Sequence, residues 1–325
     1  MGFLRKLLSY KKVCIQCHDN PDADAVGSAF GVYRYLQANG IEADIVYGGT
    51  QRIKKNSLKT MIRECGIPVR HVESISDFDL LLTIDCQYGE GNVQKFPAEK
   101  VMIIDHHIQA RELDCDYMIC SVFHSCAALV YKMLKEEGYP VKEDQGLVVS
   151  LLFGLYTDTA GFADLFHAED IILRTELYEE QPLFDRLTKM NMSVAELMIA
   201  SDAMYHHYLD IERGFALVGA LKCDQSVLGI IGDFMIQVDM VLLSLVYTQA
   251  NTGYQLSMRT CHEGLRANEI MAYLCDGIGS GGGHARKAGG RIWQKKMEEK
   301  YGTSEIGEIM EKLLSEYIDT HPFDA

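Results

Sequence analysis

The 325-residue sequence predicts an α/β fold in two parts. In the first half, short apolar runs alternate with helical patterns, which is typical of an open, mostly parallel sheet with helices on both faces. The second half contains strand-like segments, further helical patterns and a glycine-rich stretch, and these indicate a smaller α+β domain. The length also suits two domains, because one domain usually takes about 100–200 residues.

Four apolar runs in the first half are expected to be strands of the parallel sheet. A strand that is buried on both faces reads as a nearly continuous apolar run rather than as an alternating one. Such runs lie at residues 12–17, 43–47, 79–84 and 100–104. Apolar residues at helical spacing predict helices between and after these strands, at residues 25–39, 55–65, 125–137 and 144–156.

The second half is expected to begin with a long helix, residues 194–212, that connects the two domains. Strands are expected after it at residues 215–222, 229–232 and 253–260, and helices near 238–248 and at 267–275. The stretch 277–290, GIGSGGGHARKAGG, is expected to form a loop. We therefore place the first domain at residues 1–185, a helical connector at 186–212 and the second domain at 213–325.

No stretch of the sequence is typical of a membrane span or a signal peptide. The longest apolar stretch, residues 227–247, is interrupted by Asp233, Gln237 and Asp239. Ten cysteines without a secretory signal indicate free thiols in a reducing compartment. We therefore expect a cytoplasmic protein with no membrane partner.

The chain is acidic, with 31 basic and 46 acidic residues and a formal net charge of −15. Proteins that bind long nucleic acids usually present a basic stripe, because neutralised phosphates supply most of their affinity. We therefore expect no long nucleic acid as a ligand, unless bound cations reverse the sign of the field locally. Small anionic ligands are compatible with this composition.

Acidic and histidine side chains gather where the predicted apolar elements end. Two clusters follow the strands 12–17 and 100–104, one acid follows the strand 79–84, and one follows the apolar run SLLFGLYT. In an open α/β sheet, ligands bind at the carboxyl ends of the strands. The residues concerned are His18, Asp22, Asp24, Asp85, Asp105, His106, His107 and Asp158.

These residue types point to metal ions. Clustered buried carboxylates are costly unless cations offset their charge. Carboxylate oxygens mixed with imidazole nitrogens, and without thiolates, suit Mn²⁺ or Mg²⁺ better than structural zinc. Two such ions about 3.5–4 Å apart can activate water against a phosphoester. The alternative, that each acid caps a helix or lies in a loop, suits any single acid better than all of them together.

Several sequence blocks resemble the DHH family of phosphoesterases, in order and spacing. They are HDNPDADAVGSA at residues 18–29, Asp85 at a strand end, DHH at 105–107 and LYTDTAGF at 155–162. The stretch GSGGGHARKAGG and the upstream LSMR resemble the C-terminal domain associated with this family, so the resemblance covers nearly the whole chain. The short two-domain form is similar to the bacterial oligoribonuclease (nanoRNase) and 3′-phosphoadenosine 5′-phosphate phosphatase group.

The resemblance implies two Mn²⁺ ions, or Mg²⁺ or Co²⁺ in their place, bridged by Asp85. The other ligands would be His18 and Asp22 for one ion, and Asp24, His106 and Asp158 for the other. Asp105 would orient a ligand histidine, as carboxylates near metal-bound imidazoles usually do. His107 would face the substrate phosphate, as a candidate proton donor.

The resemblance also implies a substrate grip in the second domain. Arg259 and His284 would bind the phosphate end of the substrate. Gly281, Gly282 and Gly283 would let backbone N–H groups approach phosphate oxygens, which residues without side chains allow. Two positions depart from the family pattern, since Ser280 and Cys126 stand where glycine and threonine are common. Neither is expected to contact a proposed ligand, so we expect an altered fit of the substrate rather than a loss of chemistry.

The expected activity is hydrolysis of short RNA to 5′-mononucleotides, and of 3′-phosphoadenosine 5′-phosphate to AMP. Because an acidic surface disfavours long strands, RNAs of about two to five nucleotides fit best. Hydrolysis of a linear or cyclic dinucleotide signal is an alternative within the family. An alternative of another class is a catalytically silent nucleotide sensor, against which the complete ligand set argues. A homodimer is compatible with the sequence.

Other histidine and cysteine patterns are interpreted as structural. The motif CIQCH at residues 14–18 matches the attachment site of c-type haem. Cys14 and Cys17, however, lie in a predicted buried strand without an export signal. The histidines outside the acidic clusters also default to structural roles: His71, His124, His167, His262 and His321.

Overall fold

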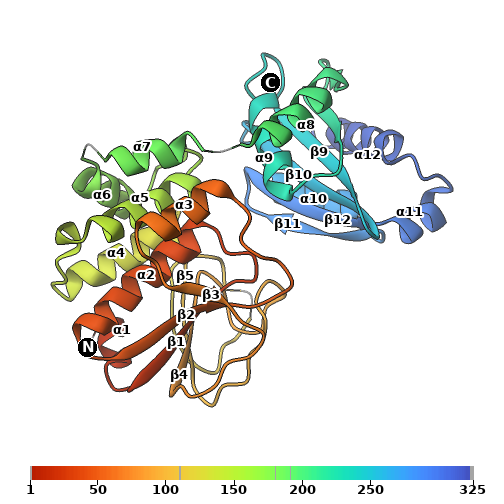
Figure 1. Ribbon diagram of the computed structural model, residues 1–325. Helices are drawn as coiled ribbons and strands as arrows, with labels where there is room; N and C mark the ends of the chain where they lie inside the picture. The colour runs from red at the N-terminus through yellow and green to blue at the C-terminus, as the bar shows by residue number, and fades with distance from the viewer. Residues whose placement is uncertain (1, 110, 180, 191, 323–325) are drawn as a thin grey trace. The chain divides into compact units, whose positions relative to one another are not determined.

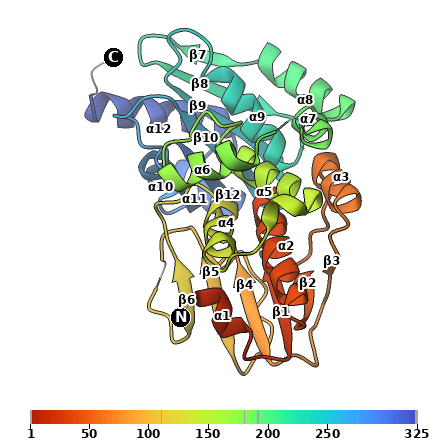
Figure 2. The ribbon, with the colours of Figure 1, turned by 90° about the vertical axis from the view of Figure 1, so that its left-hand side faces the viewer.

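The structure is a computed structural model that describes residues 2–109, 111–179, 181–190 and 192–322. The chain divides into two compact units, Met1–Asn191 and Met192–Ala325. Each unit is built around one six-stranded sheet (Figures 1 and 2).

The sheet of the first unit is parallel throughout, with the strand order β3-β2-β1-β4-β5-β6. The order reverses between β1 and β4, so the carboxyl ends of these two strands lie side by side at the place where open sheets bind ligands. The edge strands β3 and β6 were not predicted, because they are short and half exposed. The strands are β1 (Lys12–Cys17), β2 (Glu42–Tyr47), β3 (Val69–His71), β4 (Leu80–Ile84), β5 (Val101–Asp105) and β6 (Asp116–Ile119).

The helices of the first unit pack into one large core on one face of this sheet. On the other face, Cys14, Val46 and Leu81 pack with Phe96 from the connection between β4 and β5. The helices are α1 (Phe3–Leu7), α2 (Ala23–Ala38), α3 (Asn56–Glu64), α4 (Cys126–Glu136), α5 (Gln145–Asp158), α6 (Ala168–Leu177) and α7 (Pro182–Thr188), with a 3₁₀ turn, η1, at Val141–Glu143.

The sheet of the second unit is mixed, with the order β11-β12-β10-β9-β8-β7. Only β8 and β9 pair in parallel; the other pairs among the described residues are antiparallel. The strands are β7 (Tyr208–Asp210), β8 (Phe215–Ala220), β9 (Leu243–Ala250), β10 (Gly253–Thr260), β11 (Gly279–Gly283) and β12 (Lys287–Trp293).

Helices cover both faces of the second sheet, and each face has its own apolar core. On one face α8 and α9 pack around Val218 and Val246. On the other face α10 and α12 pack around Leu256 and Met258. The helices are α8 (Val194–Tyr205), α9 (Gln225–Met235), α10 (Ala267–Cys275), α11 (Gln294–Tyr301) and α12 (Ile306–Thr320). The predicted fold class, a parallel α/β unit followed by a smaller α+β unit, is confirmed. The helices of the first unit were expected on both faces of its sheet, but among the described residues the second face is covered by loop residues such as Phe96 instead.

Two element predictions in the second half were wrong. Residues 229–232, predicted as a strand, lie inside helix α9. The isoleucines favour a strand, but Gly229 and Gly232 let the helix lie close to Arg259 on β10. Residues 238–248, predicted as a helix, lie mostly in strand β9. This strand is buried on both faces, and periodicity cannot distinguish such a run from a buried helix.

Two further segments also differ from the prediction. The helix expected over residues 194–212 ends at Tyr205, and β7 follows because its backbone pairs with β8. The glycine-rich stretch 277–290 is not a loop, because most of it forms the antiparallel strands β11 and β12. Among the described residues, no helix has both the length and the apolar character needed to cross a membrane.

We predict that Gly27→Ala destabilises the first unit although alanine favours helices. A Cβ atom at Gly27 on α2 would lie 2.5 Å from the backbone oxygen of Ser150 on α5. Because the backbone of α5 cannot move as a side chain can, we expect a loss of about 1–3 kcal/mol in the free energy of unfolding, measured by urea denaturation. Gly31→Ala on the same helix is the matched control, since its Cβ would meet only side chains. Equal stability of the two variants would contradict this account of the α2–α5 contact.

Candidate metal centre

The loop after β1 brings His18 and Asp22 to the carboxyl edge of the first sheet. Asp22 is the N-cap of α2, and its Oδ1 accepts a hydrogen bond from the Ala25 amide at 3.0 Å. Its other oxygen, Oδ2, lies 3.8 Å from Nε2 of His18. A cap of this kind fixes the carboxylate where the helix begins. Local helix chemistry therefore positions Asp22 beside His18.

Asp24 lies in the first turn of α2, fully buried, and points to the start of α4. Its two carboxylate oxygens accept hydrogen bonds from the backbone amides of Cys126 and Ala127, at 2.6 and 2.8 Å. The first amides of a helix have no partner within the helix, so they are free to bind a carboxylate. The expectation that Cys126 does not contact a ligand was therefore wrong. The contact could not be predicted, because it is made by the backbone amide, which any residue type can supply.

Asp85 follows β4 directly and has a left-handed backbone, with φ at 58°. This conformation is uncommon for a residue with a side chain, and such residues gather at functional sites. The Asp85 amide donates to the carbonyl of Ile104 on the neighbouring strand β5, which holds the residue in this conformation. The Asp85 side chain is almost completely buried.

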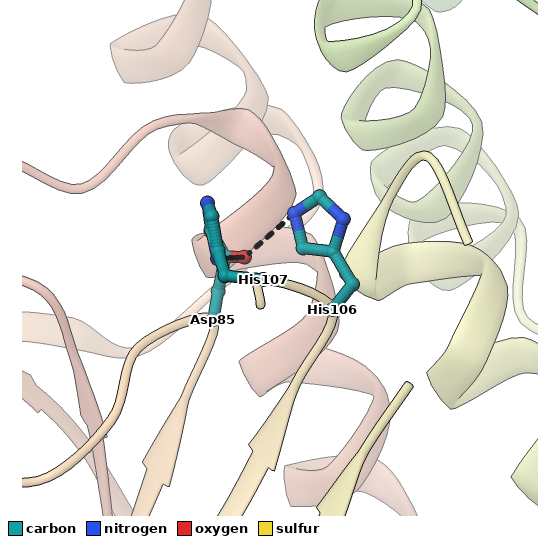
Figure 3. A group of neighbouring side chains, drawn as sticks. All are labelled: Asp85, His106 and His107. Carbon is teal, nitrogen blue, oxygen red and sulfur yellow. Dashed lines mark ion pairs between the residues drawn. The ribbon is translucent and has the colours of Figure 1, made fainter. Parts of the chain in front are cut away.

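His106 follows β5 and aims one ring nitrogen into the group of acids. Its Nδ1 lies 3.2 Å from the carbonyl oxygen of Phe123, which fixes the ring. Its Nε2 lies 3.3 Å from Oδ1 of Asp85, 3.6 Å from Oδ2 of Asp158 and 3.9 Å from Oδ2 of Asp24. Figure 3 shows Asp85 together with His106 and the neighbouring His107.

Among the described residues, the potential metal ligands form three overlapping groups. In each group the ligand atoms lie within 4.8 Å of one another. The two oxygens of Asp85 face different groups, because Oδ1 lies 3.3 Å from His106 and Oδ2 lies 3.7 Å from His18. The groups are His18–Asp22–Asp85, Asp24–His106–Asp158 and Asp85–His106–His107. The structure thus brings together all six residues for which the resemblance implies a ligand role.

Two atoms at the middle of these groups lack the partner that burial requires. Asp85 Oδ1 and His106 Nε2 are both buried, and neither has a hydrogen-bond partner among the described residues. An unpaired buried polar atom costs about 1–3 kcal/mol, more for a charged group. A divalent cation would satisfy both atoms, since it binds carboxylate oxygen and neutral imidazole nitrogen. The residues present therefore fit a metal centre.

The electrostatics of the acids support the same conclusion. Burial raises the pKa of Asp85 well above its usual range, and the nearby Asp24 raises it further. Burial raises the pKa of Asp24 to about 6, against the opposing attraction of His106. The pKa of Asp158 is raised well above its usual range by burial and by Asp24. In the absence of a cation these carboxylates repel one another, so a divalent ion would stabilise their charged forms.

Asp105 contacts the ring of His107 rather than that of His106. Its carboxylate accepts hydrogen bonds from His107 Nδ1 at 2.8 Å, Gln87 Nε2 at 2.8 Å and the His106 amide at 2.9 Å. Burial opposes its charge, but these donors hold the pKa of Asp105 below its usual range. Asp105 therefore orients His107, while the carbonyl of Phe123 orients His106.

The predicted substrate residues of the second unit are divided between the two faces of its sheet. The register aligns Gly282 with Gly289 and Ser257, so these residues share a face with Arg259. A Cβ atom at Gly282 would meet nothing within 4 Å, whereas one at Gly281 would lie 2.6 Å from Met271 Cγ on α10. Gly281 therefore allows the close approach of α10, and Gly282 leaves open space on the face of the sheet that carries Arg259.

The remaining two substrate residues lie at the end of β11. Gly283 has a φ of +143°, and its Cβ would lie 2.5 Å from the carbonyl oxygen of Lys287, so this position requires glycine for the hairpin. The His284 amide donates to the same carbonyl at 2.7 Å.

Arg259 is 16% exposed and its Nε donates to Oδ1 of Asp233 at 2.7 Å. Asp233 was not among the predicted residues.

Part of the first unit is similar to a known protein family. Residues 12–155 match the model of the DHH family, N-terminal domain. An uncharacterized protein of Methanocaldococcus jannaschii is 25% identical over 288 residues, which cover 86% of this chain and 57% of that protein. A cyclic-di-AMP phosphodiesterase of Geobacillus thermodenitrificans is 27% identical over 174 residues, which cover 49% of this chain and 26% of that protein.

Further similarities extend to a pyrophosphatase and to solved structures. A probable manganese-dependent inorganic pyrophosphatase of Streptococcus thermophilus is 28% identical over 173 residues, 51% of this chain and 54% of that protein. This chain thus spans between a quarter and three fifths of the length of these curated relatives. An exopolyphosphatase-related protein of Bacteroides fragilis shares the fold, with a TM-score of 0.77, 18% identity and coverage of 98% of this chain and 96% of that chain.

We predict that Mn²⁺ raises the melting temperature of the protein and that Asp85→Asn abolishes most of this increase. A ligand at 100 times its dissociation constant stabilises a folded protein by about 2.7 kcal/mol. Without metal, Asp85→Asn is expected to be as stable as the parent or more so, because the change removes a buried charge from among other acids. Thermal denaturation with and without Mn²⁺ measures both effects.

The matched control for this experiment is Asp116→Asn, which makes the same chemical change at an exposed position on β6. It should keep the full increase with Mn²⁺. An equal increase in the parent and in Asp85→Asn would show that the ion binds elsewhere.

Proposed function

Because the N-terminal unit is a domain of the DHH family of metal-dependent phosphoesterases, we propose that this chain hydrolyses the phosphoester bonds of small nucleotides. The proposed substrates are short RNAs, from which 5′-mononucleotides are released, and 3′-phosphoadenosine 5′-phosphate, from which AMP is released. In both substrates the bond between phosphorus and a 3′-oxygen would break.

The observation that carries this proposal is the position of Asp85 between two ligand groups. One of its oxygens faces His18 and the other faces His106. A carboxylate placed in this way can bridge two divalent ions, and Mn²⁺ is supported by the probable manganese-dependent relative. His18 and Asp22 would complete one site, and Asp24, His106 and Asp158 the other. Two ions so held would supply Lewis-acid activation of water and of the phosphate.

The chain's own residues would orient the substrate and move protons. Oδ1 of Asp105 accepts a hydrogen bond from Nδ1 of His107 at 2.8 Å. The other ring nitrogen, Nε2, therefore points away from this carboxylate. His107 would therefore contact the substrate phosphate. In the second unit, Arg259 would bind a phosphate group, on the sheet face where Gly282 leaves open space. Asp233 would hold the guanidinium in place through its bond to Nε.

The charge of the chain supports a short substrate. With a net charge of −15, the protein would repel the many phosphates of a long strand, whereas a small ligand meets only the local field of the metal ions and Arg259. We therefore propose RNAs of about two to five nucleotides rather than long RNA or DNA.

A second candidate is the hydrolysis of a linear or cyclic dinucleotide signal. It is favoured by the 27% identity to a cyclic-di-AMP phosphodiesterase over 174 residues. A silent nucleotide sensor is disfavoured, because a single missing acid would silence the centre, whereas all six ligand candidates come together.

The test is product formation with added Mn²⁺ from three substrates: 5′-phosphorylated diadenylate, 3′-phosphoadenosine 5′-phosphate and cyclic diadenylate. We expect AMP from the first two, only with metal, and the order of kcat/KM identifies the preferred class. Asp85→Asn should lose at least about 10³-fold, since its carboxylate would hold both ions.

Faster hydrolysis of the cyclic dinucleotide than of the other two substrates would favour the second candidate. Absence of product from all three, with Mn²⁺ bound in the thermal experiment, would overturn the proposed activity and favour the sensor.

A further inference from the structure

A histidine outside the predicted site lies in a loop whose backbone contacts two candidate metal ligands. His124 occupies the loop between β6 and α4. The carbonyl oxygen of the preceding residue, Phe123, lies 3.2 Å from Nδ1 of His106 and fixes that ring. The amides of Cys126 and Ala127, two and three residues further on, hold Asp24. His124 therefore lies between two backbone contacts that each position a candidate metal ligand.

A buried carboxylate fixes the orientation of His124. Asp170, in the first turn of α6, is fully buried. Its Oδ2 accepts hydrogen bonds from both the backbone amide and Nδ1 of His124, each at 3.0 Å. Its Oδ1 has no hydrogen-bond partner among the described residues. Every hydrogen bond that the structure gives to this carboxylate side chain thus comes from His124.

This contact involves Nδ1 of the His124 ring and not Nε2. A carboxylate accepts and does not donate, so Nδ1 of His124 carries a proton. Nε2 makes no hydrogen bond to any described residue, and the side chain is 35% exposed. Phe166, which is 64% exposed, lies beside the ring with centroids 6.0 Å apart. An exposed aromatic ring of this kind can stack on a nucleobase.

We propose that His124 is a catalytic residue that donates the proton to the leaving 3′-oxygen, and that Asp170 is its positioning residue. A partly exposed histidine whose Nδ1 is held by a buried carboxylate, and whose Nε2 makes no hydrogen bond to the described residues, is arranged as a general acid. This inference rests on the proposed function, and it assigns a group to a step of the same reaction.

The proposed step transfers one proton from the imidazole ring of His124 to the leaving group. A water oxygen bonds to phosphorus, and the bond from phosphorus to the 3′-oxygen breaks with its electron pair left on that oxygen. The proton on Nε2 of the doubly protonated ring moves to the 3′-oxygen, which leaves as a hydroxyl group. The ring is then neutral, with its proton on Nδ1, and takes a proton from solvent in place of the one that the attacking water releases.

The test compares two forms of 5′-phosphorylated diadenylate, one with the natural 3′-oxygen and one with sulfur at the bridging 3′ position. A thiolate leaves without a proton, so only the oxygen substrate needs a general acid. The variant is His124→Asn, whose side-chain amide can still donate to Asp170. We expect kcat on the oxygen substrate to fall by about 10²–10³-fold, and kcat on the sulfur substrate to stay within about threefold of the parent.

Two controls separate chemistry from structure. His321→Asn changes a histidine of the second unit whose Nδ1 lies close to Thr320 and to the carbonyl of Tyr317, and it should leave both rates unchanged. The Mn²⁺-dependent increase in melting temperature should be the same in His124→Asn as in the parent, which shows an intact metal centre. Asp170→Asn should lower the rate on the oxygen substrate by a smaller factor and be rescued by sulfur in the same way.

Equal losses on the oxygen and sulfur substrates, or no loss on either, would overturn the role of His124. A parent protein that hydrolyses neither substrate would instead refute the proposed function, and this inference would fall with it. The parent rate therefore distinguishes the two failures.

Discussion

The mutual repulsion of buried carboxylates at the edge of the first sheet is the constraint on which this molecule depends. Burial raises the pKa of Asp24, Asp85 and Asp158, and the charge of Asp24 raises the pKa of Asp85 and of Asp158 further. The neighbouring histidines offset this repulsion only in part, and Asp85 Oδ1 and His106 Nε2 lack hydrogen-bond partners among the described residues. The apolar core of the first unit thus supports a cluster of charges that becomes favourable when divalent cations bind.

The backbone, more than any side chain, holds this cluster in place. Asp24 is bound by the first amides of α4, His106 by the carbonyl of Phe123, and Asp22 by the amide of Ala25. Such contacts do not depend on the side chain of the donor. The contact of Cys126 with Asp24 therefore does not depend on the cysteine side chain.

The glycines of the second unit show how one sequence motif can serve two purposes. Gly281 makes room for Met271 of α10, and Gly283 meets the backbone demand of the hairpin. Only Gly282 opens space on the face that carries Arg259. A run of three glycines thus reflects packing as much as ligand binding, because adjacent residues of a strand point to opposite faces.

Much of the first unit could be predicted from the sequence, because β1, β4 and β5 are largely apolar runs and each leads directly into an acid or a histidine. In the second unit the same kind of reasoning failed. Strand β9 reads as a helix, and the Gly229–Gly232 segment of α9 reads as a strand, since burial on both faces removes the periodicity that distinguishes the two.

The sequence by itself therefore determined the fold class and the types of ligand at the metal centre, since apolar runs and residue chemistry are local properties. Only the tertiary structure decided which histidine each carbonyl and carboxylate would orient. It assigned Asp105 to His107, Phe123 to His106 and Asp170 to His124. The last pair joins residues 46 positions apart, and no local pattern connects them, because their contact exists only when α6 packs against the start of α4.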